Sequence, residues 1–153
     1  MKIKAIAIGN TLMEDDGIAI IVVEKIRERL INNNIEVLIG ETDFKYCIAS
    51  IEEGDILFII DASYYGKNPG EITISNLEDY KHRKKIYTQH SCSVIDLIKL
   101  YYKYVKGYIV AIEVSNVSFK LGLSKELERK VPIISEEVCR YIEAKVLEVR
   151  SKY

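Results

Sequence analysis

The sequence lacks the features that mark several large classes of protein. Its 22 Lys and Arg are balanced by 23 Asp and Glu, and the net charge of −1 argues against a general nucleic-acid binder, which needs clustered positive charge. No apolar stretch approaches the ~18 residues of a membrane span. The first residues form a charged strand pattern rather than a signal peptide, so we expect a cytoplasmic protein that contacts neither membranes nor nucleic acids.

Cysteine is also scarce. Cys47, Cys92 and Cys139 are far apart and form no C-x-x-C pair, which makes them a poor disulfide framework. We interpret them as small apolar residues of the core. Cys92 lies two residues after His90, so it is the one cysteine for which a thiol role stays open.

The rest of the composition is that of one globular domain. The chain has 153 residues, of which 48% are hydrophobic and 29% charged. No internal repeat, low-complexity segment or linker divides it, so we expect a single domain over 1–153. Apolar runs alternate with helical patterns, which predicts an α/β fold: a three-layer αβα sandwich with a mostly parallel, twisted sheet of about five strands and helices on both faces.

The individual elements follow from hydrophobic periodicity and turn signals. The segment 71–75 alternates between apolar and polar residues, which is typical of a strand at a sheet edge. The expected strands are 3–8, 35–39, 55–60, 71–75 and 107–112; the expected helices are 17–30, 44–52, 91–105 and most of the chain after 122.

An acidic loop connects the first strand to the first helix. Its sequence is Gly9-Asn10-Thr11-Leu12-Met13-Glu14-Asp15-Asp16-Gly17. In open α/β sheets, ligands bind outside the carboxyl ends of the strands, and like charges crowded there repel each other unless a cation relieves them. We therefore hypothesise that Asp16 binds a metal ion. Glu14 and Asp15 are expected to be solvated or to cap the first helical turn, and Asn10 to hydrogen-bond its own loop.

Two later residues could complete such a site. Asp61 directly follows the apolar run 57–60. Its spacing alone slightly favours an acid that caps a turn or helix, but right-handed crossovers should bring it to the same sheet edge as Asp16. His90 precedes an amphipathic helix, where the alternative is a histidine bonded to the helix backbone. The other histidine, His82, lies in a charged run that we interpret as a solvated loop.

Two carboxylates and an imidazole suit a divalent ion such as nickel or zinc, and three protein ligands leave open positions for a reaction. A phosphate-binding loop is disfavoured, because Gly9 and Gly17 fit neither common glycine pattern. A phospho-receiver domain would also carry an aspartate at the position of Asp61. It is disfavoured because the acids follow the first strand late and 112–114 offers no lysine.

Three motifs together resemble the endopeptidases that mature the large subunit of nickel–iron hydrogenases. They are Gly9-Asn10-x-Leu12-x-x-Asp15-Asp16-Gly17, Asp61-Ala62 followed by Asn68-Pro69-Gly70-Glu71-Ile72, and Thr88-x-His90. The resemblance implies a metal site formed by Asp16, Asp61 and His90. It further implies that the nickel arrives in the hydrogenase large-subunit precursor. The peptidase would recognise this nickel and then remove a short carboxyl-terminal extension from the precursor. Another divalent ion could occupy the site in vitro.

Asp16 or Asp61 could serve as general base instead of ligand, and a non-hydrolytic nickel-sensing chaperone or binding module is the alternative function. We expect a monomer. The chain departs from the family pattern at Gly40-Glu41-Thr42-Asp43, where substrate contacts or loop mobility should change, and at Glu113-Val114, where relatives often have Glu-Pro.

Overall fold

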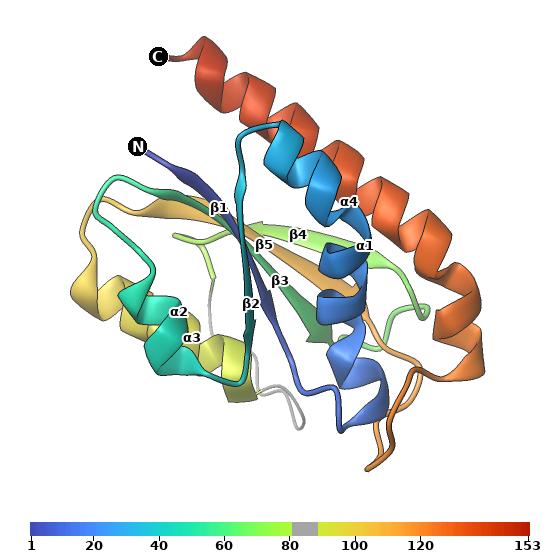
Figure 1. Ribbon diagram of the computed structural model, residues 1–153. Helices are drawn as coiled ribbons and strands as arrows, with labels where there is room; N and C mark the ends of the chain where they lie inside the picture. Colours follow the sequence, from blue (N-terminus) through green and yellow to red (C-terminus); the bar gives the residue numbers. More distant parts are fainter. Residues whose placement is uncertain (81–88) are drawn as a thin grey trace.

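The computed structural model describes residues 1–80 and 89–153, with the backbone alone from 89 to 93 (Figure 1). Within these residues, five strands form one sheet in the order β2-β1-β3-β5-β4. Strands β1, β2, β3 and β5 are parallel, and β4 pairs antiparallel with β5 at one edge. The predicted α/β class and the edge position of 71–75 are therefore confirmed. The strands are β1 (Ile3–Ile8), β2 (Glu36–Glu41), β3 (Ile56–Ser63), β4 (Ile72–Asn76) and β5 (Lys106–Glu113).

Helices cover both faces of the sheet (Figure 1). On one face lie α1 (Ile18–Asn32) and α4 (Lys125–Ser151), and on the other lie α2 (Phe44–Ala49) and α3 (Gln89–Tyr101). A short 3-10 helix, η1 (Glu14–Gly17), precedes α1. No helix in the described part of the chain is long and apolar enough to cross a bilayer.

Alternation along β3 determines which helices each side chain meets. Phe58, Ile60 and Ala62 belong to the core under α1 and α4, whereas Leu57 and Ile59 belong to the core that includes α3. Successive strand residues point to opposite faces, so Asp61 follows Leu57 and Ile59 onto the α3 face.

Two predicted boundaries were wrong at positions that matter for the site. Strand β3 does not stop at Ile60: it continues to Ser63, because its residues stay in register with β5 up to the pair Ser63 and Glu113. Helix α3 begins at Gln89, so His90 lies in its first turn and not before the helix. Thr88 of the third motif and the charged run around His82, which we interpreted as a solvated loop, lie outside the described residues.

A buried ion pair closes the amino-terminal edge of the sheet. The ammonium group of Lys4 lies 2.6 Å from an Asp55 carboxylate oxygen, and both side chains are buried. The same carboxylate accepts hydrogen bonds from the backbone N–H groups of Lys2 and Glu52. Burial alone would raise the pKa of Asp55, but the bond from Lys4 and the two backbone donors together hold that pKa below its usual value of 3.8.

This ion pair should make stability depend on pH. Because the pKa of Asp55 is lower in the folded state, its contribution is present above the unfolded-state pKa and is lost as the pH falls through the folded-state pKa. We expect Asp55→Asn to lower the free energy of unfolding at pH 7 by about 3–5 kcal/mol, since it removes the buried partner of Lys4 and leaves the half-exposed Glu36 carboxylate, 3.9 Å away, as the counter-charge. Urea unfolding at pH 7 and pH 3 should show a smaller acid-induced loss in this variant than in the wild type; equal losses would contradict the assignment.

Candidate functional site

The sheet order places a topological switch point between β1 and β3. From β1 the chain passes through α1 to β2 on one side, and then crosses through α2 to β3 on the other side of β1. In open α/β sheets, ligands bind at the carboxyl ends of the strands that flank such a point. The pairing of these two strands reaches Ala7 and Ile60, one residue before Asp61. The candidate acids therefore occur where the fold itself predicts a ligand site.

Asp16 is held against the end of β1. The backbone at Gly9 has φ of +146°, and a Cβ at this position would collide with the carbonyl oxygen of Asp16, so only glycine allows the loop to fold back. The N–H of Asn10 donates to a carboxylate oxygen of Asp16 at 2.8 Å. The Asn10 side chain in turn accepts from the N–H of Leu12 at 3.0 Å, as predicted for a residue that fixes its own loop. The Asp16 side chain is buried by this arrangement.

Asp61 reaches the same edge from β3. Its side chain is buried, and the following N–H, that of Ala62, donates to one carboxylate oxygen at 2.8 Å. The helix η1, which carries Asp16, packs against β3. The structure thus brings both carboxylates to the carboxyl edge of the two central strands, in a buried setting where a cation or a proton would stabilise each of them.

The third candidate, His90, has a side chain that lies outside the described residues. The backbone of α3 nevertheless fixes the position of the first turn. After α3 ends, the N–H of Lys103 donates to Glu53 and Lys106 begins β5 at the amino-terminal edge of the sheet. Helix α3 therefore runs antiparallel to the strands, with its first turn toward the edge that carries Asp61. Among the described side chains, no three Asp, Glu, Cys or His form a metal-binding group.

Asp15 has a role that the sequence interpretation missed. It is fully buried, and its carboxylate accepts four hydrogen bonds of 2.7–3.0 Å from the N–H groups of Ser115, Asn116 and Ser124 and from the Ser124 hydroxyl. The expectation of a solvated or helix-capping acid was therefore wrong. Asp15 fastens both ends of the loop between β5 and α4 to the acidic loop.

Glu14 fastens the middle of the same loop. It is also buried, contrary to the expectation of a solvated acid, and one carboxylate oxygen accepts from the Asn116 side chain and the Ser118 hydroxyl at 2.9 Å. The other oxygen lies 3.7 Å from the ammonium group of Lys120. The three consecutive acids thus have different roles: Glu14 and Asp15 anchor a distant loop, whereas Asp16 lies at the sheet edge. The Ser and Asn residues of 115–118 were the available signal, because they supply the donors that buried carboxylates require.

Glu113 positions the chain that follows Asp61. It is buried at the end of β5, and its carboxylate accepts from the hydroxyl of Ser63 and from the N–H groups of Tyr65 and Gly66 at 3.0–3.2 Å. The sequence interpretation noted this residue only as a departure from a Glu-Pro pattern. The carboxylate of that pattern is present here, and it anchors the backbone next to the candidate site.

The other departure from the family pattern also has a structural explanation. Asp43 accepts a hydrogen bond from the N–H of Tyr46 at 2.9 Å and so caps helix α2. Gly40 lies against Cys47, whose sulfur would collide with a Cβ at this position. The carbonyl of Glu41 accepts from the N–H of Gly9, which joins this loop to the acidic loop.

Two of the cysteines are unsuited to nucleophilic chemistry. Cys47 and Cys139 are free and buried, and burial is the main cause that raises the pKa of each to about 11. At neutral pH both remain thiols, which are poor nucleophiles. Their interpretation as small apolar residues agrees with this environment. The side chain of Cys92 lies outside the described residues.

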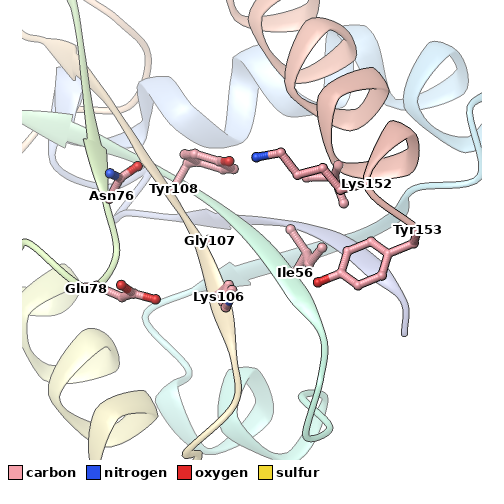
Figure 2. A pocket seen from close by; sticks show the side chains of 9 residues that line it. Ile56, Asn76, Glu78, Lys106, Gly107, Tyr108, Lys152 and Tyr153 are labelled. Atoms are coloured by element: carbon pink, nitrogen blue, oxygen red, sulfur yellow. The ribbon is translucent and has the colours of Figure 1, made fainter.

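A surface pocket of about 210 Å³ lies at the opposite end of the sheet (Figure 2). It is formed by the starts of β3 and β5, the end of β4 and the end of α4, with Ile56, Lys106 and Lys152 among its lining residues. Neither Asp16 nor Asp61 lines it. This pocket is a groove beside the last turn of α4 and is separate from the candidate site.

The fold and the site together define an α/β protein with two buried carboxylates at a switch point. The chain belongs to the hydrogenase maturation protease family, whose HycI model matches residues 20–141. The matched range includes Asp61 and His90, while Asp16 precedes it.

Individual relatives agree with this membership. The chain is 34% identical over 74 residues to the hydrogenase expression/formation protein HupD of Bradyrhizobium diazoefficiens. The aligned residues cover 48% of this chain and 38% of that relative. The aligned part thus spans well under half of the relative's length. Among solved structures, the hydrogenase maturating endopeptidase HybD from Escherichia coli has a TM-score of 0.73 at 21% identity, covering 95% of this chain and 94% of that one. The [NiFe] hydrogenase maturation protease HybD from Thermococcus kodakarensis has a TM-score of 0.69 at 25% identity, covering 92% and 99%.

Proposed function

We propose that this protein is an endopeptidase that removes a carboxyl-terminal extension from the nickel-loaded precursor of a nickel–iron hydrogenase large subunit. The observation that carries the proposal is the position of two buried carboxylates, Asp16 and Asp61, at the switch-point edge of the sheet in a chain that belongs to the hydrogenase maturation protease family. We also propose that the protein acts in the cytoplasm as a monomer.

In this proposal, Asp16, Asp61 and His90 bind the nickel that the precursor carries. Carboxylate oxygen and imidazole nitrogen are suitable ligands for Ni²⁺, and three protein ligands leave coordination positions for the precursor's own groups. Support comes from the Asp61 side chain, which lies on the face covered by α3, the helix whose first turn contains His90. Another divalent ion could take the same ligands in vitro.

Peptide hydrolysis at this edge requires water, a base and a polarised carbonyl. Where Asp16 or Asp61 serves as general base instead of ligand, its carboxylate accepts a proton from the attacking water while the water oxygen bonds to the scissile carbonyl carbon. The C–N bond then breaks as the protonated side chain returns this proton to the leaving nitrogen, which becomes the free amine of the released extension. Nickel carried by the substrate would polarise the carbonyl or orient the water. The backbone anchored by Glu113 keeps the chain after Asp61 fixed during these steps.

The test compares two forms of one substrate. Purified protein is incubated with nickel-loaded and with nickel-free precursor, and the mass of the large subunit is measured over time. We expect loss of a carboxyl-terminal fragment from the nickel-loaded form alone. Cleavage of both forms would contradict recognition through nickel. Tight binding without any mass loss would contradict the protease and favour a non-hydrolytic nickel-sensing module.

A further inference from the structure

The loop between β5 and α4 exposes large apolar side chains beside the candidate site. Phe119 is 84% exposed and Leu121 is 74% exposed, although the same loop packs Val117 and Leu123 against the core. Leu12, in the acidic loop, is 49% exposed. We name Leu12, Phe119 and Leu121 the apolar rim. Exposed apolar side chains that form one contiguous patch often mark a surface that binds another protein or a ligand.

The two segments of the apolar rim are joined by backbone hydrogen bonds. The N–H of Lys120 donates to the carbonyl of Leu12 at 3.0 Å, and the N–H of Glu14 donates to the carbonyl of Lys120 at 2.9 Å. Lys120 also forms a parallel bridge with Met13. The rim is therefore one surface built from both loops.

Buried carboxylates hold this surface in place. Asp15 accepts four hydrogen bonds from the two ends of the loop between β5 and α4, and Glu14 accepts two more from the middle of this loop. A flexible loop would lose conformational entropy on binding, whereas a fixed loop has already lost most of it. Phe119 and Leu121 are thus presented to solvent by a preorganised part of the molecule.

The position of the rim indicates what covers it. Leu12 lies four residues before Asp16 in the same loop, and the loop that leads into α4 extends beyond the ends of β1 and β3, beside the start of α1 (Figure 1). A polypeptide whose scissile bond lies at the ends of β1 and β3 would extend beside these loops. The ion pair with Glu14 balances the charge of Lys120, which leaves the rim mainly apolar.

We propose that the apolar rim binds an extended, apolar segment of the protein substrate next to the scissile bond. This inference rests on the proposed protease function and names the part of the surface that holds the substrate chain. Burying a Leu or Phe side chain strengthens binding by about tenfold or more, so two rim residues suffice to align a segment for cleavage.

The test is the double variant Phe119→Ser/Leu121→Ser, assayed with the nickel-loaded precursor. We expect KM to rise by about tenfold or more, with a smaller effect on kcat. The matched control is Leu100→Ser/Leu147→Ser, which changes two side chains that are 74% and 68% exposed but lie away from both loops. This control should leave KM within about twofold of the wild type, and both variants should keep the wild-type Tm.

The outcomes separate this inference from the proposed function. If the wild type cleaves the precursor and the rim variant has an unchanged KM, the rim inference is wrong and the protease function stands. If the wild type binds the precursor without cleaving it, the rim variant and the control variant are compared with the wild type by their Kd for the precursor instead of by KM. If the wild type neither binds nor cleaves it, both proposals fail. Light scattering that shows a dimer broken by the rim variant, with KM unchanged, would assign the rim to a second copy of the chain instead.

Discussion

Replacing Asp61 by Asn is expected to slow cleavage of the nickel-loaded precursor by about 10²- to 10⁴-fold. The amide keeps the size of the carboxylate, and its oxygen can still accept the hydrogen bond from Ala62. It removes the negative charge, so the side chain can neither take a proton from water nor bind a cation strongly. Because His90 is the third ligand in the proposed site, His90→Ala is expected to lower the cleavage rate by a similar factor. Mass spectrometry of the large subunit gives the rate.

A matched control distinguishes a loss of chemistry from a loss of structure. Asp79→Asn makes the same chemical change at an exposed position beyond β4, where the carboxylate accepts a long 3.3 Å bond from the Asn76 side chain. This control should cleave at the wild-type rate. The Tm of Asp61→Asn should remain within a few degrees of the wild type. Full activity in Asp61→Asn, or a Tm loss large enough to explain its inactivity, would remove Asp61 from the proposed chemistry.

The central layer of the fold was predictable because the parallel strands are buried on both faces. Such strands are continuous apolar runs, and β1 was predicted with both ends correct. The end of β3 was missed because its last residues include Asp61 and Ser63, which do not resemble a buried strand. They remain in the sheet because β5 supplies partners for their backbone. Backbone pairing, and not side-chain polarity, sets that boundary.

The predictable features of the candidate site are those that follow from the order of strands and helices. The features that depend on contacts between residues far apart in the chain were not predictable. Short right-handed crossovers imply that the ends of β1 and β3 are neighbours, so Asp16 and Asp61 could be assigned to one edge from sequence. The roles of Asp15 and Glu113 could not, because their donors lie 100 and 50 residues away along the chain. Local rules favour solvent or a helix cap for such acids. A carboxylate that accepts several bonds from a distant loop is visible only after the chain has folded.

Replacing Asp15 by Asn is expected to be among the most destabilising single changes at this edge, although it preserves the volume of the side chain. The carboxylate accepts bonds at both oxygens, and the amide would turn an NH₂ group toward donors such as the N–H of Ser124. A buried donor left without its acceptor costs about 1–3 kcal/mol, and the charge-assisted character of the remaining bonds is lost as well. We expect the free energy of unfolding to fall by about 3 kcal/mol and Tm by about 6–12 °C.

The neighbouring Glu14 provides the control for this expectation. Glu14→Gln faces side-chain donors, Asn116 and Ser118, which can reorient toward the amide oxygen, so its cost should be about 1 kcal/mol. Hydrogen exchange gives a second readout, because the amides of Ser115 and Ser124 should exchange faster in Asp15→Asn than in Glu14→Gln. Equal stability of the two variants, with unchanged exchange at those amides, would show that the loop is held by its apolar residues. In that case the rigid display of Phe119 would have a different cause.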